Sequence, residues 1–269
     1  MGLRIIYGRA GTGKSEYCYN EIFKLNEEIL IITPEQFSFT AEKKLMNAIK
    51  TQAVLNAEVI TLSRMAYRVI NEIGEKTRTS LSECGKAMLI YSILGNNKKN
   101  LKFLGKTDEN LEVIETAITE FKKHGIRVEQ IKQEIDNQSD VYLRNKLQDM
   151  YTIYDEFENQ LAGKYIDETD LLTILAENVD KVEQFKNKII YIDEFAGFTS
   201  QEYEIIKKLI GISKQVTITI CTDELHEIKN PDTDIFYSNQ VTINKLLNLA
   251  KECDVNVEEI KLVETYRYK

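Results

Sequence analysis

An eight-residue segment near the start of the chain combines glycines, a lysine and a serine at a spacing that binds phosphate. It consists of Gly8, Arg9, Ala10, Gly11, Thr12, Gly13, Lys14 and Ser15 and fits the pattern G-x-x-x-x-G-K-[ST]. The glycines let the loop point several backbone N–H groups at one anion. Lys14 would place its charge on the β- and γ-phosphates, and Ser15 would offer a hydroxyl to Mg²⁺. All eight residues are therefore predicted to bind ATP with Mg²⁺.

The alternative interpretation of this segment is a chance glycine-rich turn. Its context argues against that alternative, because an apolar segment precedes it and a helical pattern follows. A helix that starts at the loop also adds the positive end of its dipole to a phosphate site.

Two acids, Asp193 and Glu194, directly follow the apolar residues 189–192. An acid at the end of a buried strand is the Walker B arrangement, in which Asp193 would hold Mg²⁺ together with Ser15. Glu194 would orient and polarise the attacking water as a general base. A solvated acidic strand end is the alternative. In one sheet with the glycine-rich loop, the pair predicts that Asp193 and Glu194 are catalytic.

Three weaker candidates lie where other strands are expected to end. They are the polar turn at residues 33–36, Asp223 after the strand at 215–221, and Arg267 after the last strand. Ligands of open α/β sheets bind at the carboxyl ends of strands, which favours a role for each. Arg267 would then reach the γ-phosphate. Ordinary polar turns and an exposed charge remain open as alternatives.

Short apolar strands alternate with helical patterns at both ends of the chain. We expect strands at residues 3–7, 28–33, 58–62, 188–193, 215–221 and 257–263, and helices at 14–25, 38–50, 200–210 and 237–253. Such alternation predicts an α/β fold with a parallel sheet and helices on both faces.

The middle of the chain has a different pattern. Residues 63–186 contain no convincing strand and no proline, and apolar residues recur there at helical spacing. We therefore expect an all-helical insertion at 63–186 within an α/β domain formed by 1–62 and 187–269. Turns between its helices are expected at 96–100 and 105–108.

Three tyrosines of this insertion, Tyr142, Tyr151 and Tyr154, allow two interpretations. They could form a surface on which nucleic-acid bases stack, or they could pack between two helices. Their helical spacing favours the packing interpretation.

Composition limits the classes of protein that fit. The net charge is −8 over 269 residues, with 43% hydrophobic and 29% charged residues. A free-standing nucleic-acid binder is usually basic, so DNA contacts are expected through a local patch or within an assembly. No apolar run approaches the ~20 residues of a membrane span. Cys18, Cys84, Cys221 and Cys253 lack zinc-ligand spacing and are predicted to be buried thiols in a reducing cytoplasm.

The layout resembles the first motor domain of UvrD-like, superfamily-one DNA helicases. Three segments are more narrowly similar to the N-terminal region of the AddB family, the B subunits of AddAB (RexAB) ATP-dependent helicase–nucleases. These segments are residues 4–15, 31–42 and 198–203.

The resemblance implies a RecA-like P-loop fold that works with an AddA-type subunit on double-strand DNA ends during recombinational repair. It also implies a much longer protein with a second helicase-like half and a nuclease domain that holds an iron–sulfur cluster. The 269 residues would then be a piece of that protein. In this family the helicase-like part of the B subunit is regarded as a degraded motor that helps to read Chi in single-stranded DNA.

The sequence departs from active helicases of this type at several points. No glutamine motif that would read adenine precedes Gly8. Residues 195–197 are Phe-Ala-Gly where active motors have Gln-Asp, and the segment at 221–224, Cys-Thr-Asp-Glu, lacks the glutamine of the Gly-Asp-x-x-Gln motif that active motors carry after the fifth strand. We therefore expect ATP–Mg²⁺ binding with slow or absent hydrolysis by this chain alone, since the second motor domain lies beyond it, and weak, salt-dependent binding of single-stranded DNA. The alternatives are a self-sufficient ATPase and an unrelated P-loop phosphotransferase, for which no arginine-rich lid motif is present.

Overall fold

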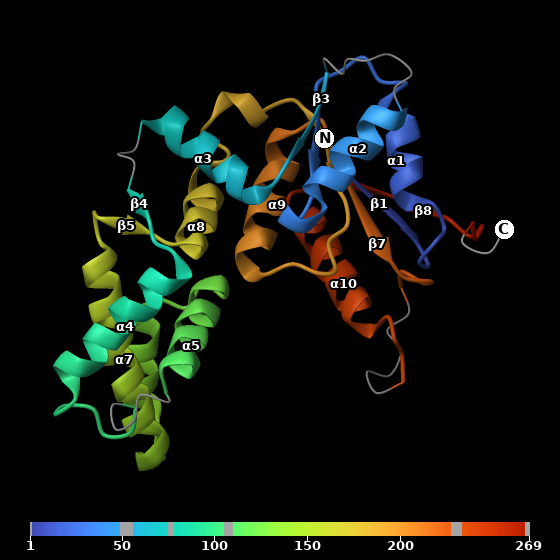
Figure 1. Ribbon diagram of the computed structural model, residues 1–269. Coiled ribbons are helices and arrows are strands. Elements are labelled where there is room, and N and C mark those ends of the chain that lie inside the picture. The colour runs from blue at the N-terminus through green and yellow to red at the C-terminus, as the bar shows by residue number, and fades with distance from the viewer. Residues whose placement is uncertain (1, 49–55, 75–77, 105–109, 227–232, 267–269) are drawn as a thin grey trace. The chain divides into compact units, whose positions relative to one another are not determined.

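A computed structural model describes residues 2–48, 56–74, 78–104, 110–226 and 233–266. The chain divides into two compact units (Figure 1). The first unit is formed by Met1–Gly74 with Ile174–Lys269, and the second by Glu75–Thr173. In the described part of the chain, no helix is both long and apolar enough to span a bilayer.

The first unit is built on a six-stranded sheet. Its strands are β1 (Gly2–Gly8), β2 (Ile29–Ile32), β3 (Ala57–Ile60), β6 (Ile189–Ile192), β7 (Gln215–Cys221) and β8 (Asn256–Lys261). They lie in the order β3-β2-β6-β7-β1-β8, and every neighbouring pair is parallel. The predicted α/β class and parallel sheet are therefore confirmed. Because all strands run the same way, the ends of β1, β6 and β7 meet at one edge of the sheet.

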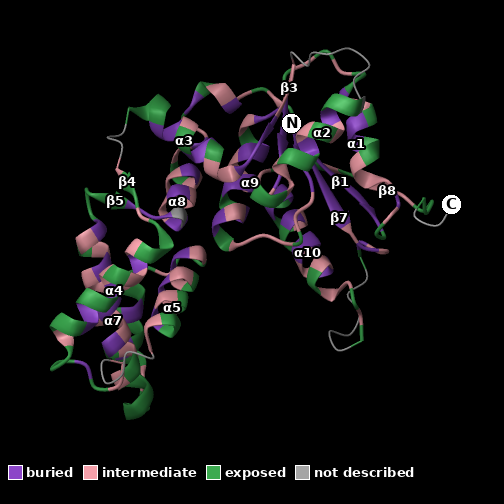
Figure 2. Cartoon of the chain, in the orientation of Figure 1, coloured by how far each residue is buried: buried purple, intermediate pink, exposed green. Residues whose placement is uncertain are grey.

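Helices cover both faces of this sheet (Figure 1). One face packs against α1 (Lys14–Ile22) and α2 (Ser38–Ala48), and the other against α9 (Ser200–Ile212) and α10 (Tyr237–Glu252). The strands β1, β2, β6 and β7 are almost continuously buried, as Figure 2 shows, because helices cover both of their faces, whereas the edge strand β8 is mostly exposed. This explains why β2 and β6 read as unbroken apolar runs in the sequence and why β1 is interrupted only by Arg4 between its terminal glycines.

The connections reverse direction within the sheet. From β1 the chain passes through α1 to β2 and then to the edge strand β3, whereas β6, β7 and β8 lead toward the opposite edge. Right-handed crossovers in opposite directions place the helices on opposite faces. A crevice forms at such a reversal, and it is where open α/β sheets bind ligands.

A buried charge network attaches α1 to the sheet. Arg4 of β1 is only 6% exposed; its Nη1 donates to Glu21 Oε1 of α1 at 2.7 Å and its Nε to Thr217 Oγ1 at 3.1 Å. The Tyr191 hydroxyl of β6 donates to Glu21 Oε2 at 2.8 Å. Burial opposes ionisation of Glu21, but the bonds from Arg4 and Tyr191 outweigh it, so the pKa of Glu21 lies below its ordinary value of 4.5. The network thus ties the helix after the glycine-rich loop to three strands.

The second unit is mainly helical. Its helices are α4 (Glu83–Asn97), α5 (Leu111–Lys123), α6 (Val128–Asn137), α7 (Val141–Leu161) and the start of α8 (Glu168–Asn178). Its apolar core lies between α4, α5, α6 and α7. The expected turn at 96–100 follows the end of α4, and the one at 105–108 falls outside the described residues.

The expectation that residues 63–186 contain no strand is wrong in one detail. β4 (Thr79–Ser80) and β5 (Tyr165–Ile166) form a short parallel pair. Two residues are too few to show the alternation by which a strand is recognised in a sequence. The pairing depends on segments more than eighty residues apart, which only the folded chain brings together.

An ion cluster connects β5 and α8 to the helices of the second unit. Lys122 Nζ of α5 lies 2.9 Å from Asp167, 2.6 Å from Asp170 and 3.0 Å from Glu158. Burial disfavours its charge, but these carboxylates outweigh burial and raise the pKa of Lys122. Charges of opposite sign are therefore matched where water is excluded.

Candidate functional site

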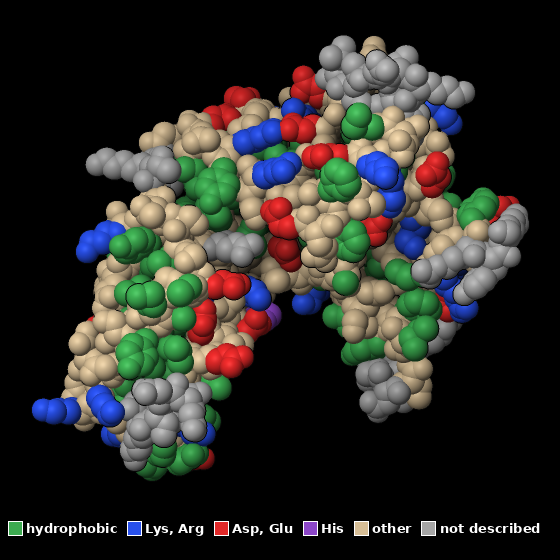
Figure 3. Space-filling model, viewed as in Figure 1, with side chains coloured by type: hydrophobic (Ala, Val, Ile, Leu, Met, Phe, Trp, Pro, Cys, Tyr) green, Lys and Arg blue, Asp and Glu red, His purple; other side chains and the backbone are tan. Residues whose placement is uncertain are grey.

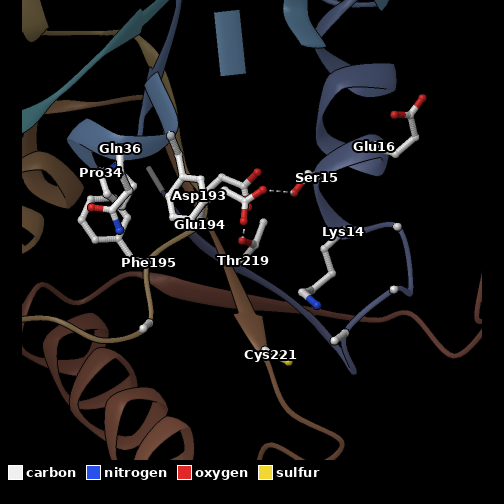
Figure 4. Close-up of a pocket in the computed structure, with 15 residues that line it drawn as sticks. Lys14, Ser15, Glu16, Pro34, Gln36, Asp193, Glu194, Phe195, Thr219 and Cys221 are labelled. Atoms are coloured by element: carbon white, nitrogen blue, oxygen red, sulfur yellow. Dashed lines mark hydrogen bonds between the residues drawn. The ribbon is translucent and has the colours of Figure 1, made fainter. Parts of the chain in front are cut away.

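An open cleft of about 740 Å³ lies at the carboxyl ends of the strands of the first unit. Its volume falls within the roughly 300–1,000 Å³ typical of small-molecule sites. It is lined by Ala10, Gly11, Gly13, Lys14, Ser15, Glu16, Pro34, Gln36, Phe37, Asp193, Glu194, Phe195, Ala196, Thr219 and Cys221. Figure 4 shows Lys14 and Ser15 on one side, the two acids in the middle, and Pro34, Gln36 and Phe195 opposite.

The glycines of the loop serve different physical needs. Gly11 and Gly13 have φ values of 83° and 80°, which side chains with a Cβ rarely adopt. Gly8 is required for space instead, because a Cβ there would lie 2.6 Å from Thr12 Oγ1 and closer still to the Leu262 carbonyl oxygen. Thr12 in turn donates from its hydroxyl to the Arg9 carbonyl oxygen at 2.9 Å. The loop is thus a compact turn between β1 and α1.

Lys14 occupies the first position of α1, and its ammonium is held by the loop. Its Nζ donates to the carbonyl oxygens of Gly8 at 2.9 Å and Arg9 at 3.0 Å. These are neutral partners, so the full positive charge remains beside the N-terminal end of α1. A phosphate group placed here would meet the loop N–H groups, the helix end and the ammonium together.

Asp193 and Glu194 directly follow β6, which β7 separates from β1, and both acids line the cleft together with the loop. Asp193 is only 4% exposed and accepts a hydrogen bond from the Thr219 hydroxyl of β7. Ser15 Oγ lies 3.4 Å from Glu194 Oε1, the contact drawn in Figure 4. The structure therefore brings together the predicted metal ligands Ser15 and Asp193 and the predicted catalytic Glu194.

Glu194 has two features that the sequence did not reveal. Its φ is 67°, a left-handed conformation that costs a non-glycine residue about 1 kcal/mol or more. Its Oε1 also pairs with Lys44 Nζ of α2 at 3.0 Å. The carboxylate is therefore held between Ser15 and an ammonium group rather than being open to water alone.

The acids change the ionisation of nearby groups on α1. Burial, followed by the charge of Asp193, raises the pKa of the Cys18 thiol. Burial, then Asp193 and Glu194, likewise raises the pKa of the Tyr19 phenol. Both groups therefore stay neutral, and the nearby acids form a region of negative charge that favours a bound cation.

The oxygen donors fit Mg²⁺. This ion prefers hard oxygen ligands and usually takes one or two carboxylates together with water and substrate phosphates. Ser15 provides a hydroxyl on the same side of the cleft as Lys14, and Asp193 provides a carboxylate in the middle of the cleft. The donor set is therefore of the kind that a nucleotide-bound Mg²⁺ requires.

Sequence reasoning missed Thr219 and Lys44. Thr219 is a buried polar residue on β7, and a signal was present because Thr217 and Thr219 alternate with apolar residues in that strand. Lys44 shows no such signal, because it lies on α2, which follows β2, and no local pattern connects it with Glu194. The turn at 33–36, one of the weaker candidates, contributes Pro34 and Gln36 to the cleft wall.

The remaining weak candidates have different positions. Asp223 lies near the loop and pairs with Arg9, whose Nη2 is 2.9 Å from Asp223 Oδ2. Arg267 lies outside the described residues, but the preceding Tyr266 is described. Its backbone N–H donates to the Gly11 carbonyl oxygen at 3.0 Å, and its ring lies against Gly13. The segment after β8 therefore runs over the glycine-rich loop.

The four cysteines are free thiols in different environments. Cys18 is buried, Cys221 and Cys253 are partly buried, and Cys84 is exposed on α4. The prediction that all four are buried is confirmed only for Cys18, and it is wrong for Cys84, which lies on the outer face of a helix whose opposite face forms the core.

These features define the class of the first unit: an α/β protein with a parallel sheet, whose strand ends line a cleft with a glycine-rich loop, a lysine and two acids. The chain belongs to the family described as "ADDB, N-terminal", which it matches over residues 5–269.

Curated relatives share the similarity over nearly the whole chain. The chain is 41% identical over 268 residues to the B subunit of the ATP-dependent helicase/deoxyribonuclease of Clostridium botulinum strain Loch Maree, covering 96% of this chain and 23% of that protein. It is 40% identical over 284 residues to the protein of the same name from Clostridium tetani, covering 100% of this chain and 25% of that protein. The Clostridium perfringens strain 13 protein is 38% identical over 260 residues, covering 94% and 22%. The chain thus spans about a quarter of the length of these relatives.

Proposed function

We propose that this chain is the ATP- and Mg²⁺-binding N-terminal module of the B subunit of an AddAB-type helicase–nuclease. The observation that carries the proposal is the convergence of Lys14, Ser15, Asp193 and Glu194 on one cleft at the ends of β1 and β6. The relatives' names, which state the B subunit of an ATP-dependent helicase and deoxyribonuclease, support it. The module would pair with an AddA-type subunit and act on DNA ends in recombinational repair.

The fold supports a more specific domain assignment. Residues 1–62 and 187–269 would form a RecA-like P-loop domain, and residues 63–186 a helical domain inserted into it, although the compact units of the structure meet at 74/75 and 173/174. The parallel sheet, with β1 and β6 on either side of β7, puts the loop and the acids within reach of one nucleotide. The free thiols are consistent with a reducing cytoplasm.

Binding would use groups that the structure already positions. Lys14 Nζ would exchange its two carbonyl partners for oxygens of the β- and γ-phosphates, a stronger charge-assisted pairing. Ser15 and Asp193 would hold Mg²⁺, which neutralises phosphate charge when it is bound. The Thr219 hydroxyl would keep the Asp193 carboxylate oriented for this purpose.

Hydrolysis would be slow in this arrangement. Glu194 must accept a proton from water to act as a general base, yet its carboxylate is shared by Ser15 and Lys44. Phe195 follows it on the cleft wall, where it offers no hydrogen bond to a phosphate or a water molecule. Arg267 remains the proposed γ-phosphate contact. The site would therefore bind nucleotide more readily than it turns it over.

Calorimetry with ATP and Mg²⁺ tests the proposal. The unaltered chain should bind, and Lys14→Ala should lose binding by at least about tenfold, because a charge-assisted contact contributes roughly 1.5–3 kcal/mol. Lys24→Ala is the matched control, since Lys24 is an exposed lysine just after α1 and outside the cleft. No binding by the unaltered chain, or equal affinities for both variants, would contradict the proposal.

A self-sufficient ATPase is the second candidate, because both acids are present. Robust turnover by this chain, lost in Lys14→Ala and in Glu194→Gln, would favour that candidate. Under the main proposal Glu194→Gln retains ATP binding, and turnover is low in both proteins.

A further inference from the structure

The three tyrosines that the sequence left open have different positions in the second unit. Tyr154 is 4% exposed, belongs to the apolar core and donates from its hydroxyl to the Ile126 carbonyl oxygen at 3.2 Å. Tyr151 packs partly buried against the same core. Tyr142 is 56% exposed near the start of α7. Packing therefore explains two of the three tyrosines, and Tyr142 requires another explanation.

Tyr142 contacts a lysine and an aromatic ring, and further lysines lie on the segment that carries this ring. Lys146 Nζ is 4.6 Å from its ring centre, and the Phe103 ring contacts it edge-on with centres 4.7 Å apart. Lys102 precedes Phe103, and Lys98 and Lys99 follow α4 directly. We call the group formed by Lys98, Lys99, Lys102, Tyr142 and Lys146 the lysine–tyrosine patch; all five residues are exposed.

The backbone that carries the patch is firmly held. The buried Asp149 of α7 accepts hydrogen bonds from the backbone N–H groups of Lys102, Phe103 and Leu104 at 2.7–3.1 Å. Lys102 Nζ donates to Asn145 Oδ1 at 2.7 Å. The backbone of residues 102–104 is thus fixed to the first half of α7.

The patch is positive in a negative chain. Residues 97–104 and 141–148 contain five Lys and Arg and no acid, whereas the whole chain has a net charge of −8. Among the described residues, none of the four patch lysines makes an ion pair with a carboxylate. Figure 3 shows Lys and Arg side chains at this end of the second unit, beside exposed hydrophobic groups. The nearby Glu156 is engaged by amide groups of Asn97 and Gln160.

We propose that the lysine–tyrosine patch binds the phosphate backbone of DNA. Clustered lysines without acidic partners gain affinity by releasing counterions from a phosphate chain, and an exposed aromatic ring adds a face on which a base can stack. Lys146 and Tyr142 together offer a phosphate contact beside a stacking surface. The inference refines the DNA-binding role proposed above, but it does not depend on the nucleotide cleft.

Fluorescence anisotropy with labelled single-stranded and duplex DNA over a salt series tests the patch. Three to four phosphate contacts predict a slope of log K against log salt of about −2 to −3 for single strands. The triple variant Lys98→Gln, Lys99→Gln, Lys102→Gln should lower affinity at low salt by at least about tenfold and flatten the slope by about 2. Tyr142→Ala should weaken single-stranded DNA binding by about five-fold or more, with less effect on duplex.

A matched triple variant controls for overall charge. Lys24→Gln, Lys181→Gln and Lys251→Gln remove the same charge from exposed positions of the first unit and should leave DNA binding within about twofold. Equal loss in both triple variants, or no loss in either, overturns the proposal. The proposal is also overturned if polyglutamate displaces DNA from the unaltered chain while the patch variant binds DNA with unchanged affinity. That result would indicate a site for an acidic protein partner outside the patch.

Two further measurements separate the outcomes. Circular dichroism of each variant shows whether the fold is retained. Calorimetry should show the same affinity for ATP in the unaltered chain and in the patch variants. If the unaltered chain fails to bind ATP while the patch variant still loses DNA binding, the proposed nucleotide site is contradicted and the patch is supported.

Discussion

Gly8 lies at the end of β1, and replacing it with alanine would place a methyl group where no space exists. The added Cβ would lie 2.6 Å from Thr12 Oγ1 and nearer still to the backbone oxygen of Leu262. The Leu262 oxygen belongs to backbone that is itself held, because the Leu262 N–H donates to the Tyr7 carbonyl oxygen at 2.8 Å. Backbone must therefore move, and overpacking of this kind costs about 1–3 kcal/mol.

The same displacement would alter the glycine-rich loop that we propose binds phosphate. Thr12 closes the turn through its bond to Arg9, so a shift of its hydroxyl moves the loop N–H groups that a phosphate would use. We expect Gly8→Ala to lower the melting temperature by about 2–10 °C and to weaken ATP binding at least about tenfold. Differential scanning calorimetry and titration calorimetry measure the two effects.

Gly2→Ala is the matched control at the other end of the same strand. A Cβ at Gly2 would lie 3.5 Å from the Asn256 oxygen, which is an ordinary contact with the first residue of the neighbouring strand β8. Stability should change by less than about 1 kcal/mol, and nucleotide binding should remain. If Gly8→Ala behaved like Gly2→Ala in both measurements, the packing argument for the first loop glycine would be refuted.

Four further predictions concern the polar groups that support the two units. Thr219→Val should weaken Mg²⁺-dependent ATP binding about tenfold or more, with little change when Mg²⁺ is absent, because it removes the hydrogen bond to Asp193; titration calorimetry with and without Mg²⁺ measures this. Arg4→Met should destabilise the first unit by about 3 kcal/mol in urea unfolding, because the Glu21 carboxylate loses its partner. Because the pKa of Glu21 lies below 4.5 in the folded state, the stabilisation by its carboxylate is complete above pH 4.5 and is lost as the pH falls through the folded pKa. The urea midpoint of Glu21→Gln should therefore fall less on acidification than the midpoint of the unaltered chain. Lys122→Met should lower hydrogen-exchange protection in α5, α7 and α8 while β1 and β7 stay protected, because three carboxylates lose their shared partner; equal protection throughout would contradict this.

Local sequence patterns identified most elements of the first unit. The expected strand at 215–221 coincides with β7, and those at 28–33 and 188–193 enclose β2 and β6, because strands buried on both faces are rich in apolar and β-branched residues. Expected helix starts at 14, 38, 200 and 237 coincide with those of α1, α2, α9 and α10. The β4–β5 pair was not recognisable, since it rests on a contact between distant segments rather than on a local pattern.

The sequence by itself determined the α/β class, the sheet-forming segments and the glycine-rich loop with its following lysine and serine, because these depend on neighbouring residues and on the period of each element. Only the tertiary structure decided the strand order, which separates β1 from β6 by β7 and thereby sets Thr219 against Asp193. It also decided that Lys44 pairs with Glu194, and that Gly8 is needed for space rather than for a positive φ. These are contacts between side chains and backbone far apart in the chain, and no local pattern encodes them.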